Sequence, residues 1–531
     1  MNNFLNEINK RRTFAIISHP DAGKTTLTEK LLLYGGAIRL AGSVKARKAS
    51  KHATSDWMDI EKQRGISVTS SVLQFHYDNY CINILDTPGH EDFSEDTYRT
   101  LVAADSAVMV IDGAKGIELQ TKKLFHVCAL RNIPIFTFIN KIDREIKNPF
   151  ELLDEIEKEL GIKCYPVNWP IGCGQDFKGI YQRTEEKIYT FDSKNHGQNI
   201  LTSHSGNYKD ESFKKILGEN THKSLIEDIE LLDLLDQDLN HEDILKGKLT
   251  PVFFGSAITN FGVEIFLKNF LEYSSPPSSR ESTIGDISPY EEFFSAFVFK
   301  IQANMNPKHR DRIAFMRICS GKFNKGMEVS HVQNNEKIKL SQPQQFFAQE
   351  KEIIDEAYPG DIIGVFDPGI FSIGDTLTTS NKKFKFNEMP SFSPELFANV
   401  KPINSMKRKQ FIKGITQIAQ EGAIQVFKEY NFGMEEVIVG VIGNLQFEVL
   451  EYRLKNEYNT EIKITKIPYN FIRWIEKSDV KMHDLILTSD TKKAEDLKRR
   501  NILIFQNTWS IQWAIDKNPS IVLSDIGKFK D

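Results

Sequence analysis

The chain has 531 residues, so a typical domain size of about 150 residues predicts three or four domains and excludes a single small binding module. Acidic residues outnumber basic ones by 72 to 68, and the formal net charge of -4 excludes a protein that wraps nucleic acid through an overall positive surface. Any contact with RNA must therefore be local. Hydrophobic residues make up 40% of the chain and charged residues 26%, as is typical of globular proteins.

Neither a membrane span nor a secretory signal is expected. The sequence has no run of 18 apolar residues, and the segment Met1 to Arg12 contains no apolar stretch. The five cysteines are odd in number and form no C-x-x-C pair; they are Cys81, Cys128, Cys164, Cys173 and Cys319. This pattern indicates reduced thiols and predicts a cytoplasmic protein.

Residues 1–280 are expected to form an α/β domain around a parallel sheet. Short apolar runs alternate there with helical patterns, as strands covered on both faces by crossover helices require. The predicted strands are Thr13–Ser18, Cys81–Thr87, Ala107–Asp112, Ile133–Asn140 and Pro251–Ala257. The predicted helices include Glu118–Arg131 and Pro149–Leu160, with Asn148 as the N-cap of the second. Ser67–Tyr77 is expected to add an antiparallel strand at one edge of the sheet.

The rest of the chain divides by composition into an insertion and two further domains. The segment of about 172–248 is polar and is predicted to be an insertion, and Ser274–Ser279 has the composition of a linker. Residues 287–385 have closely spaced strands, with expected turn glycines at positions 321, 326, 360, 364, 369 and 374, and predict a small β-barrel. Residues 390–531 mix helices and strands and predict an α+β domain, although the pattern is weak beyond about residue 470.

A phosphate-binding loop is predicted between the first strand and a helix. Its residues are Ser18, His19, Pro20, Asp21, Ala22, Gly23, Lys24, Thr25 and Thr26. In such a loop the backbone N–H groups surround phosphate oxygens, Lys24 reaches the β- and γ-phosphates, and Thr25 binds Mg²⁺. Ser18 stands where this motif usually has glycine, which weakens the motif taken alone because serine disfavours a positive φ.

Two further motifs follow at the ends of later strands. Asp86, Thr87, Pro88 and Gly89 form a D-x-x-G sequence, in which Asp86 is expected to hold Mg²⁺ through water and Gly89 to let a backbone amide approach the γ-phosphate. The base-recognition motif consists of Asn140, Lys141, Ile142 and Asp143. A carboxylate at position 143 accepts hydrogen bonds from N1–H and the amine of guanine but finds an acceptor on adenine, so GTP is favoured over ATP. Ser256 and Ala257 are expected to face the guanine oxygen.

These motifs resemble the translational GTPases. Gln63-Arg64-Gly65-Ile66-Ser67 is similar to their R-G-I-T switch segment, and the eight residues from Asp86 to Phe93 are similar to their D-T-P-G-H-x-D-F sequence. The resemblance implies that Ser67 takes the place of the switch threonine as a ligand of Mg²⁺ and the γ-phosphate. It also implies that His90 is the catalytic residue, which positions the attacking water.

Within that group the chain resembles the bacterial class II peptide chain release factors, over nearly its whole length and fading beyond about residue 470. The residues that carry the resemblance are Lys10–Thr26, Ser55–Met58, Trp169–Gly174, Phe299–Met305, Pro307–Arg312 and Glu421–Phe427. The resemblance implies a GTPase that is stimulated by the ribosome, acts after a class I release factor has freed the peptide, and helps that factor to dissociate without reading the stop codon. A monomer is expected off the ribosome.

Two other hypotheses stay open on the sequence alone. One is a translocase that resembles elongation factor G, although a chain that ends at Asp531 is expected to be too short for it. The other is a GTP-gated binding switch, in which hydrolysis only resets the state. Basic residues at Lys308–Arg312 predict a local ribosome contact, whereas the run of Lys407, Arg408, Lys409 and Lys413 fits the polar face of a helix better.

Overall fold

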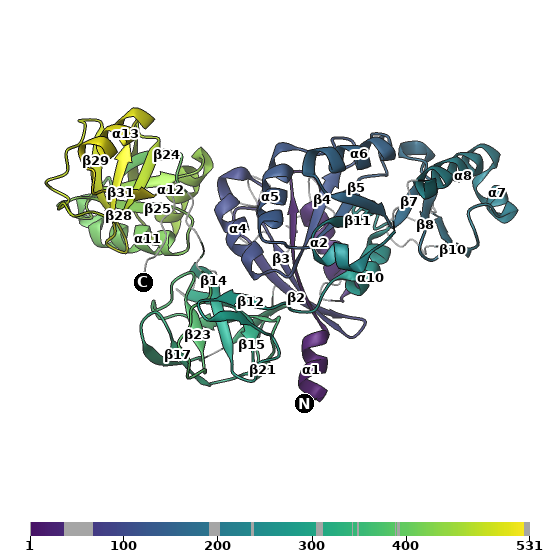
Figure 1. The fold of residues 1–531 in the computed structure, drawn as a ribbon, viewed down its shortest axis with the longest axis horizontal. Coiled ribbons are helices and arrows are strands. Elements are labelled where there is room, and N and C mark those ends of the chain that lie inside the picture. The colour runs from purple at the N-terminus through teal and green to yellow at the C-terminus, as the bar shows by residue number, and fades with distance from the viewer. Residues whose placement is uncertain are drawn as a thin grey trace.

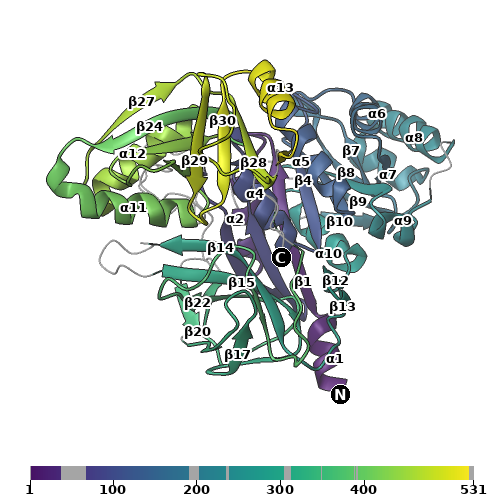
Figure 2. The same cartoon turned by 60° about the vertical axis from the view of Figure 1, so that its left-hand side comes forward.

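The computed structural model describes residues 2–36, 67–190, 202–234, 238–303, 312–341, 343–347, 350–387, 389 and 393–524. The described part of the chain forms an α/β domain, a β-barrel and a C-terminal α+β domain (Figure 1). Figure 2 shows that the C-terminal domain lies beside both other domains. Among the described residues, no helix is both long enough and apolar enough to cross a bilayer.

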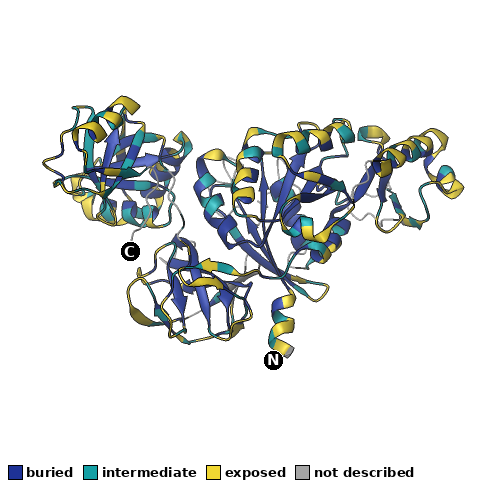
Figure 3. Cartoon of the chain, in the orientation of Figure 1, coloured by how far each residue is buried: buried dark blue, intermediate teal, exposed yellow. Residues whose placement is uncertain are grey.

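A seven-stranded sheet forms the centre of the first domain. Its order is β2-β3-β1-β4-β5-β11-β6, and every pair is parallel except β2 with β3. The strands are β1 (Arg11–Ser18), β2 (Ser71–Tyr77), β3 (Tyr80–Asp86), β4 (Ser106–Asp112), β5 (Ile135–Asn140), β6 (Lys163–Pro166) and β11 (Leu249–Phe254). All residues of β1, β4, β5 and β11 are buried, which explains their continuous apolar runs (Figure 3). The predicted strands and edge hairpin are confirmed.

Helices cover both faces of this sheet. Leu101, Leu124 and Leu152, from α4 (Ser94–Ala103), α5 (Leu119–Leu130) and α6 (Pro149–Leu160), belong to one buried apolar cluster. Leu27 and Phe266, from α2 (Lys24–Tyr34) and α10 (Val263–Tyr273), belong to another. An additional helix, α1 (Asn2–Asn9), precedes β1 and was not predicted.

The polar segment expected to be an insertion, about 172–248, contains three of the four strands of a second sheet, and the remaining strand, β7, directly precedes it. The four antiparallel strands are β7 (Asn168–Ile171), β8 (Gly179–Gln182), β9 (Lys187–Thr190) and β10 (Thr202–Ser205). The other elements of the segment are η2 (Gly174–Asp176), α7 (Glu211–Leu217), α8 (Glu219–Leu234) and α9 (His241–Leu245). Asn168 joins this sheet to the central one, because its side chain donates to the Phe254 carbonyl at 3.1 Å and accepts from the Phe254 amide at 2.7 Å.

The second domain begins with a hairpin and continues as the barrel. The hairpin strands are β12 (Arg280–Ser282) and β13 (Gly285–Ile287). The barrel strands are β14 (Ser295–Ala303), β15 (Arg312–Ser320), β16 (Phe323–Asn324), β17 (Glu328–His331), β18 (Glu336–Lys339), β19 (Gln344–Phe347), β20 (Glu350–Ile353), β21 (Glu356–Ala357), β22 (Ile362–Phe366) and β23 (Thr376–Thr378). Five of the six expected turn glycines have positive φ, but Gly364 lies inside β22, where it pairs with Phe315 of β15. Its assignment to a turn was wrong.

The C-terminal domain packs helices on an eight-stranded antiparallel sheet. Its strands are β24 (Leu396–Pro402), β25 (Gln425–Glu429), β26 (Val437–Val441), β27 (Ile462–Ile467), β28 (Phe471–Lys477), β29 (Thr491–Asp496), β30 (Asn501–Phe505) and β31 (Val522–Ser524). Its helices are η3 (Ser405–Lys407), α11 (Arg408–Gln420), α12 (Asn444–Tyr458) and α13 (Thr508–Lys517). Phe411, Ile415 and Ile418 of α11 are buried in the core, as their spacing predicts.

Candidate nucleotide-binding site

The predicted phosphate-binding loop connects β1 to α2. Gly23 has φ 100 and precedes the first turn of α2, which contains Lys24, Thr25 and Thr26. A Cβ on Gly23 would lie 2.2 Å from the side-chain nitrogen of Asn140, so glycine is required here for space as well as for backbone conformation. Ser18 is the last residue of β1, and the positive φ angles of the loop fall on Asp21 and Gly23. This explains how the loop accommodates serine at position 18.

Lys24 and Asp86 face each other beneath the loop. The Lys24 Nζ contacts Asp86 Oδ1, and both side chains are buried. The second carboxylate oxygen, Asp86 Oδ2, is buried and has no hydrogen-bond partner. An unpaired carboxylate oxygen next to a hydroxyl-bearing helix N-terminus is suited to a hard cation such as Mg²⁺. The donors at Asp86 and Thr25 therefore fit the ion that the motif requires.

The segment after β3 packs directly on the loop. Thr87 Oγ1 donates to the Ile16 carbonyl at 2.7 Å, and Thr97 Oγ1 donates to the Pro88 carbonyl at 3.2 Å. A Cβ on Gly89 would lie 3.6 Å from the Cα of Pro20. The D-x-x-G segment and the phosphate-binding loop are therefore adjacent, as their places at the ends of β3 and β1 require.

Asn140 connects three segments of the site. Its side-chain amide donates to the Ala22 carbonyl at 2.9 Å, and its Oδ1 accepts from the Ala257 amide at 2.9 Å. Asp143 Oδ1 accepts from the Ser256 hydroxyl at 2.6 Å, which fixes the carboxylate that the sequence assigns to base recognition. Ile142 is buried, and its amide donates to the Gly255 carbonyl at 3.3 Å.

Asp112 belongs to the site, although no sequence motif pointed to it. The Lys141 Nζ lies 2.6 Å from Asp112 Oδ2 and 2.6 Å from the Asp21 carbonyl oxygen. Burial raises the pKa of the Asp112 carboxyl, but hydrogen bonds from Lys141 and the Ala114 amide and the Lys141 charge outweigh it, so this pKa lies below its usual value. Asp112 ends β4 beside Asn140 of β5. The sequence could have pointed to Asp112, because it places this carboxylate at the end of a predicted strand, as it does Asp86 and Asn140.

His19 and His90 are partly exposed at the margin of the site. His19 Nε2 lies 3.3 Å from Glu118 Oε1 in the segment after β4. His90 follows Gly89, and its Nδ1 lies 3.3 Å from both the amide nitrogen and Oδ1 of Asp92. Neither Glu118 nor Asp92 had a role predicted from the sequence.

Some sequence predictions fall outside the described residues or are corrected. Ser67 begins a described segment, whereas residues 55–58, 63–66 and 308–311 lie outside the described part of the chain. Arg312 was expected at a ribosome contact, but it is buried and pairs with Asp367 at 2.5 Å. Its guanidinium also donates to the Phe371 carbonyl of the barrel and to Gln420 of α11 in the C-terminal domain, so that part of the prediction was wrong.

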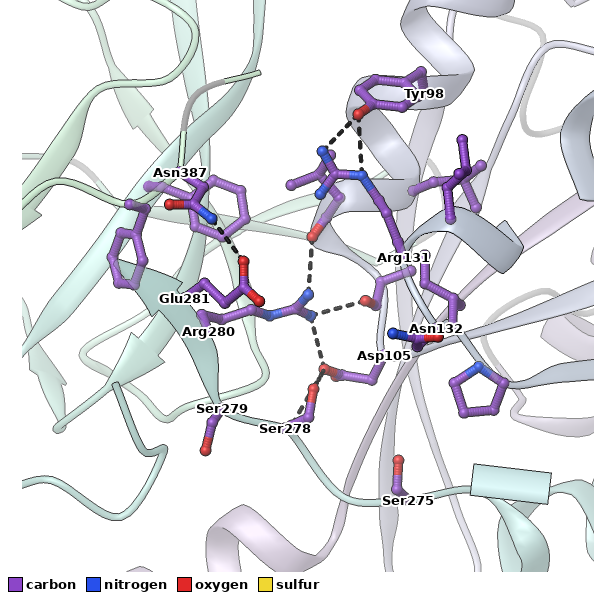
Figure 4. A pocket seen from close by; sticks show the side chains of 18 of the residues that line it. Tyr98, Asp105, Arg131, Asn132, Ser275, Ser278, Ser279, Arg280, Glu281 and Asn387 are labelled. Atoms are coloured by element: carbon purple, nitrogen blue, oxygen red, sulfur yellow. Dashed lines mark hydrogen bonds and ion pairs between the residues drawn. The ribbon is translucent and has the colours of Figure 1, made fainter. Parts of the chain in front are cut away.

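A second concave region lies at the opposite end of the sheet. It has a volume of about 670 Å³ and lies between the amino ends of β4 and β5, the segment after α10 and the barrel (Figure 4). Several of its polar groups are partnered: Arg280 bonds Asp105 at 2.8 Å, and Glu281 accepts from Asn387 at 2.7 Å. Ligands of parallel sheets bind at the carboxyl ends of the strands, so this region is a domain junction and not the nucleotide site.

Three family models match consecutive parts of the chain. Elongation factor Tu GTP binding domain matches residues 9–276, Elongation factor G domain 2 matches residues 293–380, and Class II release factor RF3, C-terminal domain, matches residues 386–515. A crystal structure of a protein from Thermus thermophilus superposes with a TM-score of 0.68 and 20% identity, covering 92% of this chain and 72% of that one. That likeness shows the fold alone.

Two relatives that match nearly the whole chain have the same name. Peptide chain release factor 3 of Symbiobacterium thermophilum is 54% identical over 522 residues, which cover 98% of each chain. Peptide chain release factor 3 of Trichodesmium erythraeum is 52% identical over 98% of this chain and 95% of its own. The identity extends over all three domains, and the chain therefore belongs to the peptide chain release factor 3 family.

Proposed function

We propose that the chain is a GTPase that acts on the ribosome in translation termination and promotes the dissociation of class I release factors after peptide release. The observation that carries the nucleotide part is the convergence of the motifs at the carboxyl ends of the strands, where Asn140 of the base-recognition motif bonds both Ala22 of the phosphate loop and Ala257 after β11. Membership in the release factor 3 family supports the termination role.

Each motif has a distinct task in this proposal. The backbone of residues 18–24 surrounds the phosphates, Lys24 neutralises their charge, and Thr25 and Thr26 lie in the first turn of the helix that points at them. Asp143, held by Ser256, accepts hydrogen bonds from guanine, while the stem of Lys141, fixed by Asp112, lies along the base. Asp86, Thr25 and Ser67 would hold Mg²⁺, which would supply positive charge against the negative charge of the phosphates.

Hydrolysis depends on the placement of a water molecule and on charge neutralisation. Phosphoryl transfer to water needs little covalent help from the protein, so orientation and electrostatics supply most of the rate. His90 follows Gly89, which lies against the phosphate loop, and His90 is only partly buried. We assign it to the orientation of the attacking water.

The proposal extends to partners and domain limits. The ribosome and the class I release factors are the macromolecular partners, and the protein is a cytoplasmic monomer when it is off the ribosome. The domains are residues 1–280 with an insertion at about 172–248, residues 287–385, and residues 390–531. The barrel and the C-terminal domain would present the ribosome-facing surfaces.

The first test is nucleotide hydrolysis with and without ribosomes. We expect GTP turnover to rise strongly on ribosomes, and we expect no ribosome-stimulated turnover of ATP. Single-turnover release of a labelled class I factor from termination complexes then separates a GTPase from a binding switch. If the His90→Ala variant with GTP frees the factor at the wild-type rate, hydrolysis is not needed for that step, and the protein acts as a GTP-gated switch.

A further inference from the structure

In the turn that follows Gly89, one ring nitrogen of His90, Nδ1, interacts with Asp92. His90 precedes η1 (Glu91–Phe93), and the Asp92 amide donates to His90 Nδ1 at 3.3 Å. Oδ1 of the same residue lies 3.3 Å from the same Nδ1. Asp92 therefore offers a donor and an acceptor to a single nitrogen of the candidate catalytic histidine.

The choice between these partners decides what the other ring nitrogen can do. When Nδ1 accepts from the Asp92 amide, the neutral ring carries its proton on Nε2, which can only donate. When Nδ1 carries the proton and donates to the Asp92 carboxylate, Nε2 becomes an acceptor for a proton of water. A carboxylate that fixes a histidine tautomer in this way is a familiar device in hydrolases.

The second oxygen of Asp92 is bound to the C-terminal domain. Asp92 Oδ2 accepts from the Leu445 amide in the first turn of α12 at 2.8 Å. The residue before α12 is Gly443, which has no side chain to cap the helix, and a Cβ there would lie 2.0 Å from Asp92 Oδ1. Asp92 thus caps a helix of another domain.

An apolar contact also packs α12 against η1. Phe93 of η1, Val68 and Val449 of α12 form a buried cluster, with Leu445 and Tyr452 packed against it. A movement of α12 away from η1 would expose these side chains and remove the anchor of the Asp92 carboxylate. The position of the C-terminal domain and the hydrogen bonding of His90 are therefore linked through one residue.

We propose that Asp92 is a positioning residue that sets the tautomer of His90. Through Asp92, this tautomer depends on whether α12 is packed against η1. The inference rests on the proposed role of His90. With α12 seated, the anchored carboxylate accepts from Nδ1–H, and Nε2 accepts a hydrogen bond from the attacking water, which orients it. Without that anchor, the ring stays in the Nε2–H form.

The test is the Asp92→Asn variant, assayed for ribosome-stimulated GTP hydrolysis. The asparagine oxygen can still accept from the Leu445 amide, but its NH₂ group can only donate to His90 Nδ1 and holds the ring in the Nε2–H form. We expect kcat to fall by about 10²-fold. GDP affinity and the KM for ribosomes should stay within about twofold, because Asp92 is buried against α12 and belongs to none of the nucleotide-binding motifs. The matched control is Glu91→Gln. Glu91 lies in the same turn as Asp92, but its side chain is exposed and pairs with Lys123 of α5, so this variant should keep the wild-type kcat.

A second variant tests the link to α12. Val449→Ala loosens the apolar seat without changing any polar group of the turn, so kcat should fall partially. The double variant Asp92→Asn/Val449→Ala should be no slower than Asp92→Asn alone, since both changes act through the same carboxylate. Additive losses would overturn the link.

The outcomes separate this inference from the function on which it rests. If His90→Ala is slow and Asp92→Asn hydrolyses GTP at the wild-type kcat, the role of His90 stands and the inference is overturned. If His90→Ala itself keeps the wild-type kcat, the proposed role of His90 and the positioning role of Asp92 are both overturned. Thermal unfolding of each variant verifies that the C-terminal domain remains folded.

Discussion

At the scale of single residues, base selection depends on one carboxylate. Asp143 is held by the Ser256 hydroxyl at 2.6 Å, so its orientation does not depend on the nucleotide alone. We predict that Asp143→Asn weakens GTP binding by about tenfold or more and favours xanthosine triphosphate, because the asparagine NH₂ can donate to the xanthine carbonyl that replaces the guanine amine. Competition between labelled GDP and unlabelled triphosphates measures the change.

The control for this substitution is a change that leaves the carboxylate in place. Ser256→Ala removes the hydroxyl that orients Asp143, so it should reduce GTP affinity without creating a preference for xanthosine triphosphate. An unchanged nucleotide preference in Asp143→Asn would remove Asp143 from base recognition.

The motif residues were predictable from sequence because each motif is contiguous and ends a strand. Asp112 and Asp92 were not assigned, because their partners Lys141 and Leu445 are distant in sequence and the pairing exists only after folding. Ser18 looked like a departure from its motif, yet the positive φ angles of the loop fall on Asp21 and Gly23. Residue type alone does not tell which position of a loop carries the unusual backbone conformation.

At the scale of elements, helix α6 shows how local chemistry fixes a boundary. The Asn148 side chain accepts from the Phe150 amide at 2.9 Å, Pro149 occupies the first turn, and Gly161 ends the helix with φ 70. We predict that Asn148→Ala lowers the free energy of unfolding by about 1 kcal/mol, whereas Asn148→Asp keeps it near the wild-type value. Urea unfolding followed by tryptophan fluorescence provides the measurement, and equal losses in both variants would contradict the capping role.

Elements with such local signals were predicted, and elements that depend on distant partners were not. Strand β6 has only four residues, and its place in the sheet comes from pairing with β11, which follows 83 positions later at Leu249. Strands β7 to β10 are equally short and lie in polar sequence. Beyond residue 470, strands β28 and β29 are partly exposed and mix apolar with charged residues, so their periodicity is weak.

At the scale of the whole molecule, Asp105 joins the first two domains. Its carboxylate is buried and accepts from Arg317 of the barrel, and also from Arg280 and the Ser278 hydroxyl of the connecting segment. Burial lowers the pKa of the Arg317 guanidinium, and the Asp105 charge opposes that shift. We predict that Asp105→Ala lowers the free energy of unfolding by about 3–5 kcal/mol, because it leaves a buried cation without its partner.

An exposed ion pair is the control for this prediction. Lys122 and Glu159 pair on the surface, where both side chains are about half exposed. Glu159→Ala should therefore change the free energy of unfolding by less than about 1 kcal/mol. Chemical denaturation of both variants under the same conditions separates the junction from an ordinary surface pair, and equal effects would contradict the role of Asp105.

The order of strands in the central sheet has a consequence for how the protein folds during its synthesis. Strand β11 lies between β5 and β6, and Leu249 follows the end of β6 by 83 positions. While the chain is being made, β5 can pair with β4, but β6 cannot join the sheet until this later strand has left the exit tunnel. At about 5–20 residues per second the delay is roughly 4–17 s. During that interval the edge of β5 that later pairs with β11 has no strand beside it.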